Sequence, residues 1–204
     1  MKTKRIITLG RQYCSGGRMI GKRVADFLGI PFYDKELIRM ASEESGIGDE
    51  FFEKVDEKVS RTLLSAIATG YLVSSSIFPL NDYLSNESLF KIQSEVIKKI
   101  ASAEPCLIVG RCADYILRDI PLLRIFITAS FEDRIERVRE RHCTNNPKEA
   151  REILEKMDKK RGDYYNYYTD KKWGDASAYD LCINSSLCGA EGAVKAICDF
   201  SERL

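Results

Sequence analysis

Compact apolar runs alternate with amphipathic stretches along most of this chain. The runs KRIITL (4–9), CLIVG (106–110) and LRIFITA (123–129) predict buried parallel strands, which are covered on both faces and so lack polar alternation. IPFYD (30–34) and YDLCINSS (179–186) predict two further strands. Strands that alternate with helices favour a three-layer α/β fold, in which helices flank a parallel sheet of about five strands.

The stretches between these strands show the three- and four-residue spacing of amphipathic helices. In residues 17–27 the apolar positions include Ile20 and Val24, and Gly29 follows as a C-cap. Ser130 is a good N-cap for the charged stretch that follows it. Further helices are predicted over residues 35–46, 88–103, 113–119, 131–142, 147–172 and 189–204.

Residues 48–102 show no strand pattern and predict a helical insert within a single domain that spans residues 1–204. Apolar side chains such as Phe51, Val55 and Leu63 fall on one face of a helix in this insert. The apolar face predicts one of two roles: a wall of a ligand site, or a surface through which the protein forms a homodimer.

Composition and charge restrict the function classes. The chain has 204 residues, 44% hydrophobic and 31% charged, and a formal net charge of +1. This balance gives no overall field towards a nucleic acid polymer or an anionic membrane, so neither partner is expected. The seven cysteines form no CxxC pair and there is one histidine, so no metal site is predicted. The apolar run near the N-terminus is too short for a signal peptide, which predicts a cytoplasmic protein with free thiols.

The stretch GRQYCSGGR (10–18) joins the first predicted strand to the first predicted helix. Backbone N–H groups of such a glycine-rich turn, backed by a helix N-terminus, bind phosphate without any side chain. The alternative is a strand-to-helix turn with no ligand. The helix N-terminus also predicts a lowered pKa for the thiol in this turn, although a small space-filling role is favoured for it. The candidate nucleotide-binding residues are Gly10, Cys14, Ser15, Gly16, Gly17 and Arg18.

The lysine that phosphate loops carry after their second glycine is absent, and so is the adjacent hydroxyl that reaches Mg²⁺. Gly17 stands at the lysine position, and Arg18 follows it. Arg18 is the predicted substitute for the lysine, although its planar guanidinium differs from an ammonium point charge. Ser15 carries a hydroxyl nearby, on the other side of Gly16.

Other candidate residues also follow predicted strands, at the sheet edge where ligands bind in such folds. Arg111 either binds a phosphate bidentately or pairs with a surface carboxylate. Asp34 either receives a substrate hydroxyl or hydrated magnesium, or caps the next helix. Residues 156–175 predict a basic lid with Lys160 and Arg161 as catalytic residues, unless this charge run is a solvated helix face.

Taken together, these motifs resemble the cytidylate kinase-like family of P-loop nucleoside monophosphate kinases. The resemblance covers most of the chain and implies a P-loop NTPase-like fold with ATP and Mg²⁺ as cofactors. It also implies that the γ-phosphoryl group of ATP is transferred to a nucleoside monophosphate. It rests on the segments GRQYCSGGRMIGKRVADFLGIPFYDKELI, CLIVGRCADYIL, PLLRIFITASFEDRIERVRER and KKRGDYYNYYTDKKWGDASAYDLCINSS.

Within this resemblance, Arg111 matches the arginine that holds the acceptor phosphate, and Asp34 matches the strand-end aspartate. The family's next aspartate, which helps to read cytosine, is Cys112 here, and Asp114 lies two residues further on as a substrate-binding candidate. These departures keep two alternatives open. One is a nucleotide-binding regulatory protein without turnover, and the other is a kinase for a different small molecule.

Overall fold

A sheet of parallel strands forms the centre of the computed structural model, which describes residues 5–34, 86–144 and 146–202. The order across the sheet is β2-β3-β1-β4-β5, so both neighbours of the central strand come from later parts of the chain. Because every pairing is parallel, the carboxyl ends of the strands meet along one edge. The strands are β1 (Ile6–Arg11), β2 (Phe32–Tyr33), β3 (Cys106–Val109), β4 (Leu123–Thr128) and β5 (Leu181–Asn184).

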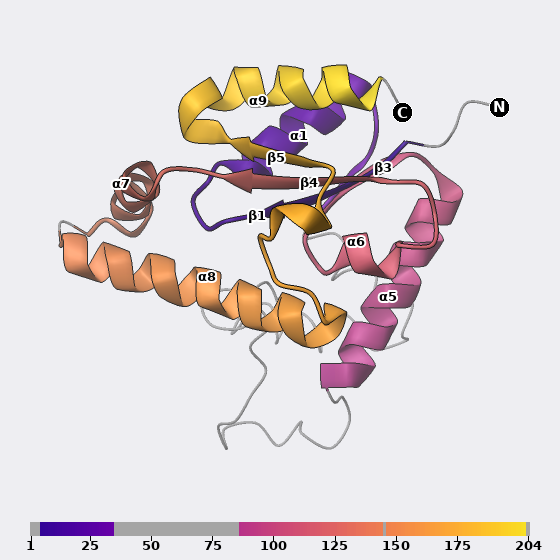
Figure 1. Cartoon of the computed structure of the whole chain (residues 1–204), viewed down its shortest axis with the longest axis horizontal. Coiled ribbons are helices and arrows are strands. Elements are labelled where there is room, and N and C mark those ends of the chain that lie inside the picture. The colour runs from indigo at the N-terminus through magenta and orange to yellow at the C-terminus, as the bar shows by residue number, and fades with distance from the viewer. Residues whose placement is uncertain (1–4, 35–85, 145, 203–204) are drawn as a thin grey trace.

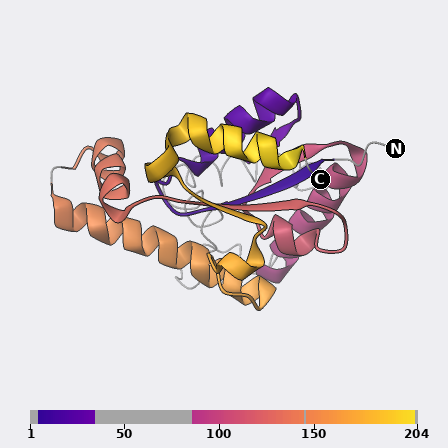
Figure 2. The same ribbon diagram turned by 45° about the horizontal axis from the view of Figure 1, so that its top comes forward.

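Helices cover both faces of the sheet (Figures 1 and 2). Helices α1 (Gly17–Leu28) and α9 (Ser185–Ser201) lie on one face, and α5 (Asn86–Ala103) and α6 (Ala113–Ile116) lie on the other. Neighbouring residues of β1 serve opposite layers: Ile7 packs with the α1 and α9 side chains, whereas Ile6 packs with those of α5 and α6. This burial on both faces explains the continuous apolar runs in the sequence.

Helix α7 (Phe131–His142) lies beyond the end of β4, at the left of Figure 1, and α8 (Pro147–Thr169) runs from there beneath the sheet, on the same face as α6. Their facing side chains, including Val138 and Leu154, form a small core of their own with Tyr13 from the turn after β1. The predicted N-cap of α7 is confirmed, because Ser130 Oγ accepts a hydrogen bond from the Asp133 amide. The turn after β1 is therefore packed against α7 and α8.

The predicted fold class is confirmed, and each of the five predicted strands is present. The helix predicted over 35–46 lies outside the described residues, as do residues 48–85 of the predicted insert. The end of that insert is α5, which begins two residues before the predicted helix start. No helix in the described ranges is long and apolar enough to cross a bilayer.

Two element boundaries differ from the prediction. The structure extends β1 through Gly10 and Arg11, which pair with Phe126 and Ile127 of β4. A Cβ atom on Gly10 would lie 2.7 Å from a ring carbon of Phe126, so this glycine is required by sheet packing. The placement of Gly10 in the turn was wrong. Helix α9 begins at Ser185 rather than at Gly189, whose φ of 66° and ψ of 177° interrupt the helix.

Candidate phosphate-binding site

The turn between β1 and α1 is held by side chains that bind its carbonyl groups. Arg161 Nη1 donates to the Arg11 carbonyl at 3.0 Å, and Arg137 Nη1 donates to the Cys14 carbonyl at 3.0 Å. Ser185 Oγ donates to the Ser15 carbonyl at 2.7 Å. Because these carbonyls are engaged from outside, the turn keeps a fixed shape in front of the N-terminus of α1, where amides favour an anion.

Helix α8 is also fastened to this turn by a carboxylate. Asp158 Oδ1 accepts a hydrogen bond from the Tyr13 amide at 2.6 Å, and Asp158 Oδ2 forms an ion pair with Arg134 of α7. The Arg134 side chain is only 7% exposed, so this pair is largely withdrawn from water. The predicted lid segment is therefore bonded to the phosphate-loop candidate in this structure.

Four guanidinium groups gather around one carboxylate at the carboxyl edge of the sheet. Arg18 Nε lies 2.6 Å from Asp34 Oδ2, and Arg11 Nη2 lies 3.9 Å from Asp34 Oδ1. Burial and the nearby cations Arg161, Arg111 and Arg18 together lower the pKa of Arg11 to about 9, while Asp34 opposes this shift. Burial likewise lowers the pKa of Arg111 and of Arg161. Such crowding of like charges stabilises a bound anion.

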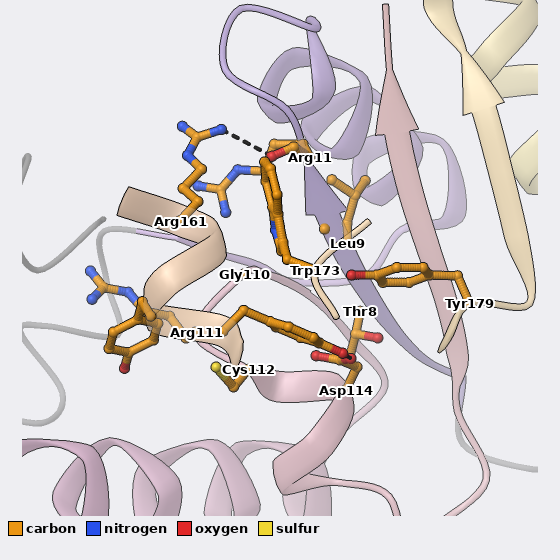
Figure 3. Close-up of a pocket in the computed structure, with 13 residues that line it drawn as sticks. Thr8, Leu9, Arg11, Gly110, Arg111, Cys112, Asp114, Arg161, Trp173 and Tyr179 are labelled. Carbon is orange, nitrogen blue, oxygen red and sulfur yellow. Dashed lines mark hydrogen bonds between the residues drawn. The ribbon is translucent and has the colours of Figure 1, made fainter. Parts of the chain in front are cut away.

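A small cavity of about 40 Å³ lies between β1, the start of α6 and α8 (Figure 3). Figure 3 shows Arg11, Arg111 and Arg161 on one side of it, and Asp114 and Tyr179 on the other. The lining residues are Thr8, Leu9, Gly10, Arg11, Gly110, Arg111, Cys112, Asp114, Arg161, Tyr164, Tyr165, Trp173 and Tyr179. A basic rim and a polar aromatic floor therefore share one pocket.

The floor of this pocket is a buried tyrosine–aspartate pair. Tyr165 Oη donates to Asp114 Oδ2 at 2.6 Å, and Asp114 is 9% exposed. Burial raises the pKa of Asp114, although the Tyr165 hydrogen bond opposes this shift. Cys112 is buried beside it, and burial raises the pKa of its thiol. The residue after Arg111 is thus a neutral thiol, and the carboxyl group two residues on is already hydrogen-bonded.

The structure brings most of the predicted site residues together. Arg111, Asp114 and Arg161 line the pocket, and Arg18 and Asp34 form an ion pair at the same edge of the sheet. Lys160 is absent from the pocket lining. Its pKa is lowered, chiefly by burial and also by the positive charge of Lys156. Gly16 and Gly17 occupy the N-cap and first position of α1, as the loop prediction requires.

The Ser15 hydroxyl is not directed towards a metal ion, and the Cys14 thiol is not activated. Ser15 Oγ donates to the Gln12 carbonyl at 2.9 Å, which turns the hydroxyl into the loop. The predicted lowering of the Cys14 pKa is wrong. Burial raises the pKa of this thiol more than the neighbouring Arg141 lowers it, because desolvation disfavours the thiolate.

The sequence reasoning missed Arg11, since a glycine after an apolar strand suggested that the strand had already ended. Its guanidinium reaches the cavity from β1 and lies within the arginine cluster. The doublet Gly16-Gly17 was the available signal, because a glycine in the first turn of a helix often makes room for another chain segment.

The described residues fit a protein-held Mg²⁺ poorly. They include no group of three or more histidine, cysteine or acidic residues arranged to hold a metal ion. Arg18 stands at the loop position that usually supplies a hydroxyl, and Asp34 is engaged by Arg18 and Arg11.

Comparisons with known proteins agree with this geometry. A model described as the cytidylate kinase-like family matches residues 6–187. A protein named cytidylate kinase from Desulfurococcus amylolyticus is 28% identical over 190 residues, which cover 91% of this chain and 88% of the relative. An uncharacterized protein from Eubacterium ventriosum has a crystal structure with a TM-score of 0.70 and 28% identity, over 98% of this chain and 99% of that one. Shikimate kinase from Bacteroides thetaiotaomicron shares the fold, with a TM-score of 0.56 at 14% identity over 97% and 98% of the two chains.

Proposed function

This chain belongs to the cytidylate kinase-like family, and on that premise we propose that it transfers the γ-phosphoryl group of ATP to a nucleoside monophosphate. One observation carries the proposal: the guanidinium groups of four arginines gather near the carboxylate of Asp34 beside the N-terminus of α1. The excess positive charge suits the phosphates of a donor and an acceptor together. Phosphoryl transfer needs little from a protein beyond such positioning and charge stabilisation.

The donor phosphates bind to the loop in this proposal. Amides between Cys14 and Arg18 donate hydrogen bonds to the phosphate oxygens, since the shape of their turn is fixed by bonds to its carbonyls. Arg18 supplies a cation at the mouth of the loop, where its side chain is 60% exposed. Arg161 and Lys160 contribute from α8. Mg²⁺ arrives with ATP as the partner of its phosphates, which is how this ion is commonly held.

The acceptor phosphate binds to Arg111, and Asp34 orients the acceptor. An oxygen of the acceptor phosphate attacks the γ-phosphorus, and the bond from that phosphorus to the β–γ bridging oxygen breaks. ADP leaves with the bond's electrons, and the acceptor becomes a diphosphate. The guanidinium groups stabilise the charge that spreads over the transferring oxygens.

The acceptor base lies towards Asp114 in this proposal. The Asp114–Tyr165 pair offers hydrogen-bonding groups at the pocket floor, and Tyr179 adds an aromatic face. Because Cys112 replaces the aspartate that helps cytidylate kinases to read cytosine, we expect selection among bases to be relaxed. The predicted homodimer through the insert and the cytoplasmic location remain predictions.

Two observations favour rival functions. The short Arg18–Asp34 ion pair occupies the acceptor-orienting carboxylate, which suits a nucleotide-binding regulator without turnover. The buried Cys112 at the base-reading position suits a kinase for a different small molecule.

A panel of acceptors distinguishes these functions. ADP release from ATP and Mg²⁺ is measured with each nucleoside monophosphate, each free nucleoside and a set of small hydroxy acids. We expect turnover with monophosphates alone. Measurable ATP binding with no ADP release in the presence of any acceptor would favour the nucleotide-binding regulator without turnover. Turnover with a hydroxy acid would favour the kinase for a different small molecule.

A further inference from the structure

Gly17 stands where related loops carry lysine, and the space that a side chain at this position would fill is taken by the side chain of Arg11. A Cβ atom built on Gly17 would lie 2.7 Å from Cβ of Arg11 and 3.2 Å from its Cγ. Both contacts involve the fixed root of the Arg11 side chain, so Arg11 cannot simply rotate away. In this backbone, a side chain at position 17, lysine included, therefore collides with the Cβ of any residue at position 11, including Arg11.

A second glycine accommodates the other end of the same side chain. Gly110 follows β3 with a φ of 73°, a left-handed conformation that favours glycine. A Cβ atom on Gly110 would overlap Nη1 of Arg11. Glycines from two separate strand ends thus flank the path of Arg11 from β1 into the pocket.

Within the described part of the chain, the guanidinium at the end of this path has no carboxylate within hydrogen-bond distance. Among residues 5–34, 86–144 and 146–202, its recorded polar side-chain partner is Asp34 at 3.9 Å, beyond hydrogen-bond distance. Asp34 is bonded more closely to Arg18, at 2.6 Å. Arg161 and Arg111 add positive charge on the same side of the pocket (Figure 3). Arg11 therefore carries a positive charge that the described residues neutralise only in part, at the rim of a cavity, which suits an anionic ligand.

We propose that Arg11 replaces the missing loop lysine and binds the terminal phosphate of the donor nucleotide. The proposal deepens the kinase function and rests on it. The positive charge then comes from the end of β1, on Arg11, instead of from the start of α1. Its planar fork can grip two phosphate oxygens at once, whereas an ammonium group acts as a point charge. The exchange of lysine for Gly17 is, on this account, the change that admits Arg11.

Direct binding tests the proposal without turnover. Calorimetry measures the Kd for β,γ-imido-ATP, ADP and CMP in the wild type and in Arg11→Met, which keeps the aliphatic stem and removes the charge. We expect the imido-ATP Kd to rise roughly 10- to 100-fold, as for loss of a hydrogen bond to a charged group. The Kd for ADP stays within about threefold, since ADP lacks the contacted phosphate. Arg23→Ala, on the exposed side of α1, is the control and leaves every Kd unchanged.

A compensating exchange gives the second test. Gly17→Lys alone weakens imido-ATP binding, because its Cβ displaces Arg11. Arg11→Gly removes the obstructing Cβ of residue 11, so Arg11→Gly/Gly17→Lys binds imido-ATP roughly tenfold tighter than Arg11→Gly alone. Thermal unfolding of each variant shows whether it is folded.

Three results would overturn the proposal: an unchanged imido-ATP Kd in Arg11→Met, a loss confined to CMP, or an Arg11→Gly/Gly17→Lys variant that binds imido-ATP no better than Arg11→Gly. Its failure is separable from failure of the kinase function. An unchanged imido-ATP Kd in Arg11→Met, with transfer by the wild type, sinks the role of Arg11 alone. Arg11-dependent imido-ATP binding in a protein without transfer sinks the kinase function alone.

Discussion

Arg18 and Arg11 both face the carboxylate of Asp34, but the Arg18 side chain is exposed and the Arg11 side chain is largely buried. Arg18 is 60% exposed and bonds Asp34 at 2.6 Å, whereas Arg11 shares the more buried position, with a side chain 15% exposed. An exposed ion pair contributes little to stability, because water screens it and two side chains lose freedom. The importance of Arg18 is therefore expected in ligand binding rather than in folding.

Replacing Arg18 with alanine tests that division. We expect the unfolding free energy to change by less than about 1 kcal/mol, the range for an exposed ion pair. We expect the KM for ATP to rise several-fold, and by less than in Arg11→Met. Lys22→Ala, one turn further along α1, provides the control. An unchanged ATP KM would show that Arg18 does not serve the donor phosphates.

Asp114 gives a prediction about pH. Burial raises its folded-state pKa above the unfolded value, so the folded protein holds this proton more tightly. The contribution to stability is fully present below the unfolded pKa, near pH 4, and is lost as pH rises through the folded pKa. Asp114→Asn carries no such proton, and its amide oxygen still accepts from Tyr165. The stability of Asp114→Asn relative to the wild type should therefore increase with pH from about 4 upwards.

Urea unfolding of the two proteins at a series of pH values measures this difference. A difference that stays constant across the series would mean that Asp114 has the same pKa in the folded and unfolded chains.

At the residue scale, the sequence predicted that the candidate site would bind an anion, but it identified only some of the residues that form the site. Arg111 and Asp34 were found because each follows an apolar strand, which fixes it at the ligand edge. Arg11 was missed because its role depends on space left by Gly17 and Gly110, and Gly110 belongs to a distant part of the chain. The pKa of Cys14 was wrong because the helix N-terminus was visible in the sequence and the burial was not.

At the scale of elements, α8 and the turn after β1 act as one unit. Asp158 joins the Tyr13 amide to Arg134, and Arg161 of the same helix binds the Arg11 carbonyl. A helix rich in charge looked from the sequence like either a mobile lid or a solvated face. The structure shows that two of its charged residues hold the phosphate-loop candidate.

Asp158→Ala tests this connection. The change leaves Arg134 buried without its partner, so we expect a loss of about 3 kcal/mol in the free energy of unfolding. The Tyr13 amide also loses its acceptor, and the imido-ATP Kd should rise with the loss of loop shape. Urea unfolding and calorimetry measure the two effects. Glu155→Ala breaks the exposed pair with Arg151 on the same helix and should cost less than about 1 kcal/mol. Equal losses in both variants would contradict the anchoring role.

Periodicity predicted the elements well where neighbours on both sides are apolar, as in β3 and β4. It failed at Gly10 and Arg11, where pairing with β4 holds two residues that look like a turn. It also failed at the start of α9, where Asn184 caps the helix by accepting from the Ser186 amide, before the interruption at Gly189. Tertiary pairing and local capping are the causes, and neither leaves a periodic signal.

At the scale of the whole molecule, the sheet order explains why distant residues meet. Because β1 lies between β3 and β4, the loop after β1 adjoins Gly110 and Arg111 on one side and Ser130 on the other. The parallel α/β pattern predicted this edge as the site. The fold is shared with kinases for other small molecules, so the acceptor must be identified from the pocket and by experiment.

Transfer of a labelled phosphoryl group tests the central claim most directly. The wild-type protein is incubated with γ-³²P-labelled ATP, Mg²⁺ and a nucleoside monophosphate, and the products are separated. The account predicts that the label appears in the nucleoside diphosphate and that Arg111→Met abolishes this product. Label that remains in ATP, or appears only as inorganic phosphate, in a protein that binds both nucleotides would contradict it.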